Sequence, residues 1–350
     1  MNTQTLSLKQ RWDDLKQTNP HMRIRNAAEQ LNTSEMELLA TGLLDNVYLL
    51  TPEIKSILLQ VESLGKVMAL TRNSECVHER KGVYKNGDFS NNHVGLFVNQ
   101  DIDLRIFLSH WKYCFALVDA VGDTFRKSLQ FFDKSGQAIH KIYLTPESNE
   151  QAFEQLVQKY KAQDQSIEGF NIQPCLLEMD ERMDQEIDIK GFNQKWIELK
   201  DTHDFYGLLK KYHLTRTQAL RLAPSEYYAK KVNKQSLVTL LESASAKKVP
   251  IMVFVGNSGN IQIHTGEINN TLWHKHWFNI MDPDFNMHLD MDSISQVWIV
   301  RKPTIDGVVT SLEVYNEMGQ TIVQFFGKRK PGIPELESWR QLIADLHLLD

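Results

Sequence analysis

Residues 129–143 read LQFFDKSGQAIHKIY, and residues 312–326 read LEVYNEMGQTIVQFF. Laid over each other without a gap, the two stretches share Leu, Gly, Gln and Ile in register. In each stretch a turn tripeptide, KSG or EMG, separates two runs rich in β-branched and aromatic residues, a pattern that predicts a β-hairpin. The same hairpin therefore occurs twice in the chain.

Three further pairs of stretches match in the same order: WDDLKQTN from Trp12 with WIELKDTH from Trp196, Arg25 with Arg216, and RNS at 72–74 with GNS at 256–258. The match of Arg25 requires an insertion of seven residues in the second copy. The period is far too long for a solenoid repeat. We therefore expect a duplicated domain, with copies at residues 1–165 and 190–350 and an acid-rich connector at 166–189.

Within each copy, the pattern predicts helices first and strands afterwards. Apolar residues recur at helical spacing in four segments: 24–40, 51–61, 196–222 and 235–246. Terminal helices at 147–161 and 334–348 are expected to close each copy. Short β-rich runs predict strands at Val94–Val98, Cys114–Val118, Ile251–Val255, Gln296–Arg301 and Val308–Tyr315. Because successive strands are not separated by helices, the sequence predicts an α+β fold of two tandem repeats, each with helices followed by an antiparallel sheet.

The bulk composition predicts a globular cytoplasmic protein. Of 350 residues, 42% are hydrophobic and 24% are charged, with a net charge of −5. The start, MNTQTLSLKQRW, lacks the features of a secretory signal, and no apolar run is long enough to span a bilayer. Cys76, Cys114 and Cys175 form no CxxC pattern, so neither a disulfide scaffold nor a zinc site is expected. We expect no nucleic-acid partner and no membrane insertion.

The two copies differ at positions that carry chemistry: Asn19 matches His203, Asp119 matches Lys302, Pro146 matches Arg329, and Arg105 matches His288. The second copy therefore gains an imidazole and two cations, while Arg105 is a cation of the first copy only. A neutral imidazole binds iron, and Arg or Lys binds carboxylates. A haem, with its iron and two propionates, requires this combination of groups.

Each of these residues also has an ordinary structural interpretation. His203 by itself is compatible with a surface or helix-capping histidine. Lys302 and Arg329 are compatible with solvated or salt-bridged cations, which is the usual state of such residues. Arg105 is compatible with a polar position on an amphipathic strand. The residue pattern alone leaves these alternatives open.

The chain resembles the cytoplasmic haemin-transport or haemin-degrading proteins of Gram-negative bacteria, the HemS/ChuS family. The resemblance rests on five stretches: IDLRIFLSHW from Ile102, DTHDFYGLLKKY from Asp201, LTRTQALRL from Leu214, VRKPTIDGVVTSLE from Val300 and FFGKRKPG from Phe325. It covers nearly the whole chain, including the duplication. It implies a cytoplasmic protein that receives imported haem and then either traffics it or degrades it oxidatively to release iron.

The resemblance also implies a site for haem b, as ligand or substrate, in a cleft between the copies. His203 matches the family's proximal iron ligand, and Arg105 matches the distal residue, which is catalytic if the protein is an enzyme. Phe107, two residues further along the same strand, is expected to pack on the macrocycle. The remaining matching residues bind the propionates or line the pocket: Arg216, Lys302, Phe326 and Arg329. Phe326 departs from the family, which has a tyrosine there, whereas the first copy has Tyr143.

Two functions remain open at this point. A carrier that keeps haem soluble and passes it on, without turnover, requires only His203 and the propionate-binding cations. A haem-degrading, haem oxygenase-like enzyme also requires Arg105, an oxidant and an external reductant. The expected partners are therefore haem, a haem-import transporter and, for an enzyme, a reductant or electron donor.

Overall fold

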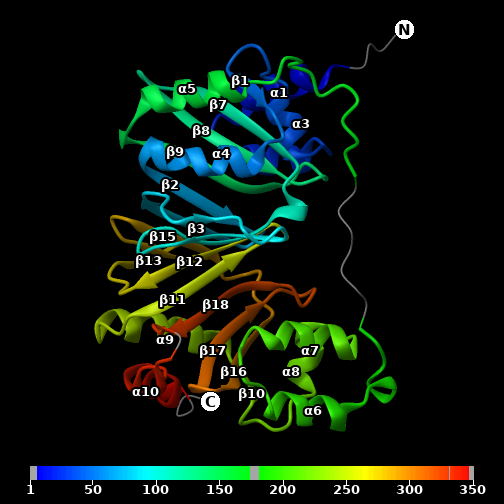
Figure 1. Ribbon diagram of the computed structural model, residues 1–350, viewed down its shortest axis with the longest axis vertical. Helices are drawn as coiled ribbons and strands as arrows, with labels where there is room; N and C mark the ends of the chain where they lie inside the picture. The colour runs from blue at the N-terminus through cyan, green and yellow to red at the C-terminus, as the bar shows by residue number, and fades with distance from the viewer. Residues whose placement is uncertain (1–5, 174–180, 331, 347–350) are drawn as a thin grey trace. The chain divides into compact units, whose positions relative to one another are not determined.

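The computed structural model describes residues 6–173, 181–330 and 332–346 (Figure 1). The chain divides into two compact units. The described part of the first unit consists of residues 6–71, 80–173 and 257–261, and that of the second consists of 72–79, 181–256, 262–330 and 332–346. Each unit therefore includes a short segment from the other half of the sequence. Within the predicted connector, residues 174–180, which include Cys175, lie outside the described residues.

The first half of the chain forms α1 (Leu8–Thr18), α2 (Ile24–Gln30), α3 (Glu35–Ala40), β1 (Val47–Leu50), α4 (Ile54–Gln60), β2 (Gly65–Arg72), β3 (Cys76–Gly82), β4 (Gly87–Asp88), β5 (Val94–Val98), β6 (Asp103–Phe107), β7 (Tyr113–Val121), β8 (Thr124–Phe132), β9 (Ala138–Ser148) and α5 (Glu150–Tyr160). The second half forms α6 (Ile189–Ile197), α7 (Asp204–Tyr212), α8 (Arg216–Arg221), β10 (Ala229–Val232), α9 (Lys234–Ala246), β11 (Ile251–Gly256), β12 (Asn260–Gly266), β13 (Thr271–His274), β14 (Trp277–Met281), β15 (Phe285–Asp290), β16 (Gln296–Thr304), β17 (Gly307–Tyr315), β18 (Thr321–Gly327) and α10 (Glu337–Leu346). The order of these helices and strands is the same in both halves, which confirms the predicted tandem repeat.

The strands of the first unit pair in the order β1-β7-β8-β9-β2, and every pair is antiparallel. Helices α4 and α5 pack on one face of this sheet, against apolar side chains of β2, β7, β8 and β9. Helix α3 covers part of the other face through Met36 and Leu39. The predicted α+β class with antiparallel sheets is confirmed.

The second unit repeats this arrangement in the order β10-β16-β17-β18-β11. Helices α9 and α10 bury one face of the sheet (Figure 1). On the other face, helices α6 to α8 pack on β10, β16 and β17: Trp196, Phe205 and Leu208 belong to the same hydrophobic cluster as Trp298 and Val300. The helices that begin the repeat therefore lie over only part of the sheet.

Both predicted hairpins form, and they have the same construction. Asp133 before β9 accepts hydrogen bonds from two backbone N–H groups of its turn, and Asn316 before β18 does the same. The third residue of each turn is a glycine with a positive φ, 78° at Gly136 and 75° at Gly319. A left-handed backbone favours glycine because it has no Cβ to clash with the following carbonyl.

One of the four sequence matches is wrong. Arg25 lies in α2, the second helix of the first repeat, whereas Arg216 begins α8, the third helix of the second. By helix order, the equivalent of Arg216 is Glu35, which begins α3. Each follows an N-cap hydroxyl, Ser34 or Thr215. Amphipathic helices offer apolar residues at every third or fourth position, so a short match shifts easily from one helix to the next.

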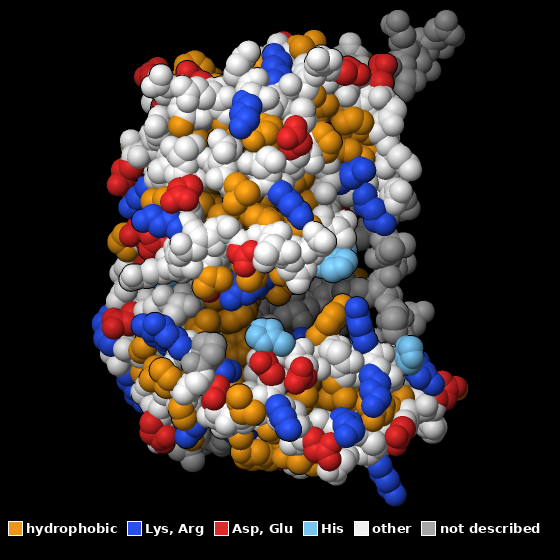
Figure 2. Space-filling model, in the orientation of Figure 1, with side chains coloured by type: hydrophobic (Ala, Val, Ile, Leu, Met, Phe, Trp, Pro, Cys, Tyr) orange, Lys and Arg blue, Asp and Glu red, His pale blue; other side chains and the backbone are white. Residues whose placement is uncertain are grey.

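Lys and Arg side chains are interspersed with Asp and Glu side chains over the face drawn in Figure 2. The described part of this face therefore carries no broad positive patch, and an anionic ligand bound there would depend on individual Lys or Arg side chains close to it. Among the described helices, none is long and apolar enough to cross a membrane.

Candidate functional site

His203 lies in the turn between α6 and α7, at the N-cap position of α7. Its backbone N–H donates to Asp201 Oδ1 at 2.9 Å, and its ring Nδ1 lies 2.6 Å from the same oxygen. An ionised carboxylate only accepts hydrogen bonds, so Nδ1 carries the proton and Nε2 is the nitrogen with a free lone pair. The His203 side chain is 90% exposed. The turn therefore presents an accessible imidazole with one nitrogen engaged.

Arg329, half-buried just after β18, lies close enough to affect this turn electrostatically. The hydrogen bond from the His203 backbone is the main cause that lowers the pKa of Asp201, and the positive charge of Arg329 lowers it further. The turn is also tied to the β16–β17 hairpin, because the Ile305 N–H donates to the carbonyl of Lys200 at 3.0 Å. The structure thus places Arg329 within electrostatic reach of the carboxylate that binds His203.

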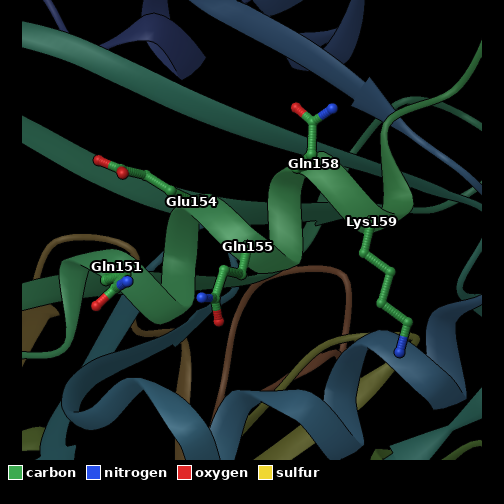
Figure 3. A pocket seen from close by; sticks show the side chains of 5 residues that line it. All are labelled: Gln151, Glu154, Gln155, Gln158 and Lys159. Atoms are coloured by element: carbon green, nitrogen blue, oxygen red, sulfur yellow. The ribbon is translucent and has the colours of Figure 1, made fainter.

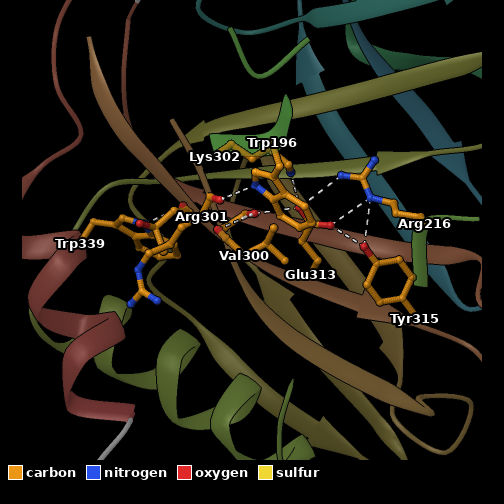
Figure 4. A network of polar contacts seen from close by, with 10 residues as sticks. Trp196, Arg216, Val300, Arg301, Lys302, Glu313, Tyr315 and Trp339 are labelled. Carbon is orange, nitrogen blue, oxygen red and sulfur yellow. Dashed lines mark hydrogen bonds and ion pairs between the residues drawn. The ribbon is translucent and has the colours of Figure 1, made fainter. Parts of the chain in front are cut away.

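Glu313 on β17 is fully buried at the centre of a polar network (Figure 4). Lys302 Nζ donates to its Oε1 at 2.7 Å, and Arg216 Nε donates to its Oε2 at 3.0 Å. Ser311 Oγ donates to Oε1 at 2.8 Å, and the Tyr315 hydroxyl donates to Oε2. A buried carboxylate is tolerated when it is paired and hydrogen-bonded in this way.

Burial by itself raises the pKa of Glu313, but Arg216 and Lys302 hold that pKa well below its ordinary value. Burial also lowers the pKa of Lys302, against the opposing effect of Glu313. Two of the three cations predicted near the propionates, Arg216 and Lys302, are therefore neighbours that share Glu313 as a partner. Only 4% of the Lys302 side chain is exposed, against 27% for Arg216, so Arg216 is better placed to meet an external carboxylate. Lys302 has the salt bridge that its ordinary interpretation anticipates, and its role at a propionate stays a prediction.

Phe326 on β18 packs against Phe254 on β11, with ring centroids 4.9 Å apart. The strand register places Phe326 opposite Ser311, so it shares a face of the sheet with Glu313. Helices α6 to α8 bury this face at β16 and β17, whereas Phe254 and Phe326 stay half-buried. The second unit thus has a partly exposed aromatic strip on the sheet face that also carries the Glu313 network.

Arg105 and Phe107 belong to the first unit, on β6. Alternate residues of a strand share a face, and both side chains are half-buried. Arg105 pairs with Asp103 on the same face. Burial raises the pKa of Asp103, and the Arg105 charge opposes that rise. The Phe107 N–H donates to the carbonyl of Gly259 at 2.9 Å. Arg105 thus has a carboxylate partner, and the distal role of Arg105 and the macrocycle contact of Phe107 stay predictions.

Two surface hollows lie elsewhere, and neither contains a predicted site residue. The first is lined by outward-pointing side chains of α5, namely Gln151, Glu154, Gln155, Gln158 and Lys159 (Figure 3). The second, of about 350 Å³, is lined by Tyr227, Arg301, Val308, Thr310, Glu335, Arg340 and Ile343. In the second hollow, Glu335 accepts hydrogen bonds from Thr310 and pairs with Arg340. The Glu335 carboxylate thus already has hydrogen-bond and ion-pair partners within the second unit.

Sequence reasoning missed Asp201, Phe254 and Glu313. A signal for Asp201 was present, because an Asp two residues before another residue commonly accepts that residue's backbone N–H. Glu313 is a lone charge within the apolar run of a predicted strand, which indicates a buried ion pair. Phe254 gave no such signal, because an aromatic residue in a strand is ordinary.

The fold and these residues define a class of protein: a duplicated α+β chain whose second repeat carries an exposed histidine, buried cations and an aromatic strip. A family model described as the haemin-degrading HemS.ChuX domain matches residues 32–160 and again 213–346. The chain therefore belongs to this family, and it contains the domain twice.

Relatives with curated names include the hemin transport protein HmuS of Yersinia pestis, 36% identical over 341 residues and 97% of each chain. The hemin transport protein HemS of Yersinia enterocolitica is also 36% identical, over 98% of each chain. Among solved structures, holo-PhuS, a heme-binding protein from Pseudomonas aeruginosa, is 43% identical with a TM-score of 0.94. The heme-degrading enzyme ChuS of Escherichia coli O157:H7 is 35% identical with a TM-score of 0.89. Both alignments cover 97% of this chain and 98% of the other.

Proposed function

We propose that this chain is a cytoplasmic haem-binding protein that receives imported haem, with His203 Nε2 as the iron ligand. The relatives support the haem part of this proposal, since two are named hemin transport proteins and PhuS is described as heme-binding. Haem is here the cargo or the substrate of the protein. The import transporter that supplies it is an expectation from the family.

The observation that carries the ligand assignment is the exposed imidazole of His203, with Nδ1 engaged and Nε2 available. Histidines that bind metals commonly donate their second ring N–H to a carboxylate in this way. In the first repeat, the matching residue Asn19 ends α1, and its side chain donates to the Thr18 hydroxyl at 3.0 Å. An amide in that position supplies no comparable ligand for haem iron.

Other residues of the second unit fit the remaining groups of haem. The half-buried rings of Phe254 and Phe326 offer an aromatic surface suited to stacking on a macrocycle. Arg329 and the exposed part of Arg216 suit the negative propionates, and Lys302 adds positive charge through the Glu313 network. Phe326 lacks the hydroxyl of the family tyrosine, a loss of about 1 kcal/mol for one hydrogen bond.

The ligand assignment predicts the behaviour of two matched variants in a haemin titration. His203→Ala removes the only proposed protein ligand, so we expect weaker haemin binding and a shifted Soret band. Asn19→Ala changes the matching residue of the first repeat and should leave both unchanged. Absorbance titration with purified protein measures both quantities. If His203→Ala bound haemin with the wild-type affinity and spectrum, the ligand assignment would be wrong.

A second function, oxidative haem degradation, is favoured by the 35% identity to ChuS, which is described as a heme-degrading enzyme. Haem iron supplies the oxygen chemistry when it is bound, and the chain binds and orients the macrocycle. We propose Arg105 as the residue that distinguishes this function from simple carriage.

The test is to supply haemin-loaded protein with a reductant and oxygen, with and without catalase, and to identify the products. A discrete tetrapyrrole product formed in the presence of catalase, and slowed by Arg105→Ala, supports degradation. Bleaching that catalase abolishes indicates peroxide damage and supports the carrier. Turnover that Arg105→Ala leaves unchanged argues against the role of this arginine.

A further inference from the structure

Asp201 and His203 form a unit that only the second repeat contains. A single oxygen, Asp201 Oδ1, accepts both the backbone N–H of His203 at 2.9 Å and the ring Nδ1–H at 2.6 Å. At the matching positions of the first repeat stand Gln17 and Asn19, so neither the imidazole nor the carboxylate is present there. The two residues therefore differ between the repeats as a pair.

A carboxylate in this position has three physical effects on the ring. It fixes the tautomer, because the proton must lie on Nδ1, and Nε2 is left with its lone pair. It orients the ring, which matters because the side chain is 90% exposed and gains little restraint from packing. It also increases the electron density on the imidazole, which makes Nε2 a stronger ligand.

The backbone of Asp201 is itself held in place. Its carbonyl accepts the N–H of Asp204 at 3.2 Å, where α7 begins. The neighbouring Lys200 carbonyl accepts the N–H of Ile305 at 3.0 Å, which ties the turn to the β16–β17 hairpin. These backbone contacts hold the turn from which the Asp201 side chain meets the His203 ring.

We propose that Asp201 is the positioning residue of the haem site: it holds His203 in the Nδ1–H tautomer with Nε2 directed toward the iron, and it strengthens the iron–imidazole bond. This inference rests on the proposed function of His203 as the iron ligand. The competing interpretation is that Asp201 only caps the turn by accepting the His203 backbone N–H.

The first test needs no haem. In the protein labelled with ¹⁵N at histidine, NMR at a pH where the imidazole is neutral reports which ring nitrogen of His203 carries the proton. We expect the Nδ1–H form in the wild type and a mixture dominated by Nε2–H, the form preferred in water, in Asp201→Ala. A wild-type tautomer in Asp201→Ala would overturn the proposal, whatever the protein does with haem.

The second test uses haemin-loaded protein and two variants. Asp201→Ala should weaken haemin binding about tenfold or more, as loss of such a partner typically does. It should also lower the Fe(II)–His stretching frequency in resonance Raman spectra. Asp201→Asn keeps an oxygen that can cap the turn but removes the charge, so the frequency should fall while the turn persists. If both variants kept the wild-type Fe(II)–His stretching frequency, Asp201 would serve only to cap the turn, and the proposal would be wrong.

Asp204→Asn is the matched control. It removes the same charge one residue from His203, and within this described turn no hydrogen bond joins Asp204 to the ring. We expect wild-type tautomer, affinity and Raman frequency for it. An Asp204→Asn effect equal to that of Asp201→Asn would show that general charge, and not the Asp201 contact, controls the ring. His203→Ala separates the two proposals, since wild-type haemin binding there refutes the ligand assignment itself.

Discussion

The buried imidazole of His140, in the first unit, shows how strongly a single residue responds to its surroundings. The ring is 1% exposed and contacts Tyr84 through Nε2 at 2.6 Å and Thr71 through Nδ1 at 2.8 Å. Asn260 donates to the same Thr71 hydroxyl at 2.8 Å. Burial lowers the pKa of His140 from 6.5 to about 3, because the charged form cannot be solvated there.

This pKa predicts an acid-sensitive first unit. Between pH 6.5 and 3 the unfolded chain binds a proton at His140 that the folded chain does not, so stability is lost as the pH falls. From pH 7 to pH 5, His140 should account for a loss of about 2 kcal/mol in the free energy of unfolding. Denaturant unfolding of wild type and His140→Gln at both pH values measures this contribution. Equal pH dependence in the two proteins would show that His140 is not responsible.

At the scale of helices and strands, equivalent helices of the two repeats attach to their sheets with opposite charges. Glu35 begins α3 and pairs with Lys141 on β9, whereas Arg216 begins α8 and pairs with Glu313 on β17. Both ion pairs are largely buried, and each satisfies a charge that would otherwise be costly. The two repeats thus keep a charge at the first residue of this helix and reverse its sign, while the partner lies on β9 in the first repeat and on β17, the equivalent of β8, in the second.

The glycine of each hairpin lies against the helix that carries this charge. A Cβ at Gly319 would stand 2.6 Å from Thr217 Oγ1 on α8, and the φ of 75° is unfavourable for other residues. Gly319→Ala should therefore lower the free energy of unfolding by about 3 kcal/mol, combining backbone strain with overpacking. Gly332, with a φ of 81° and no atom within 4 Å of such a Cβ, is the control for strain alone. Equal Tm values for the two alanine variants would exclude the overpacking.

Local patterns predicted most of these elements. The strand Val94–Val98 has the predicted bounds, and the helix expected at 235–246 begins one residue earlier, at Lys234, behind its Asn233 cap. The segment 196–222, however, holds the end of α6 and two further helices. The breaks lie at the Asp201–His203 turn and at His213, whose φ is 54°. These breaks depend on turn hydrogen bonds and a left-handed residue, which apolar spacing does not report.

The candidate site was less accessible to prediction than the fold. His203 became a candidate because the repeats differ there, and the structure adds its carboxylate partner. The burial of Lys302 could not be predicted, because it depends on Glu313 eleven positions away on the paired strand. Single-residue patterns do not reveal which charges a sheet brings together, and the contributions of Arg105, Phe107 and the propionate-binding residues stay predictions.

At the scale of the whole molecule, each unit is completed by a segment from the other half of the sequence. In the second unit, Asn73 donates to the carbonyls of Gly256 and Ile322 and accepts two backbone N–H groups of its own turn. In the first unit, Asn257 donates to the carbonyl of Ile139, and its side-chain oxygen accepts the backbone N–H groups of Gly259 and Asn260. The two asparagines are equivalent residues of the repeats.

These segments predict matched effects of two substitutions. Asn73→Ala should destabilise the second unit, and Asn257→Ala the first, by about 3 kcal/mol each, because backbone groups lose their partners. Asn91→Ala is the control. The exposed Asn91 side chain also accepts two backbone N–H groups of its own turn, those of His93 and Val94. Its loss should lower the free energy of unfolding by less, because water can replace it. Hydrogen exchange resolved by segment locates each effect. Protection lost equally in both units for either variant would contradict the assignment of one segment to each unit.

The exchanged segments also bear on how the protein is made. A nascent chain that has left the ribosome as far as residue 173 still lacks residues 257–261, so the Trp111 indole N–H has no Gly259 carbonyl to bind. At ordinary translation rates the first unit waits on the order of ten seconds for that segment. Duplication therefore has a kinetic consequence: the first copy cannot finish folding until the second copy has been synthesised as far as residue 261.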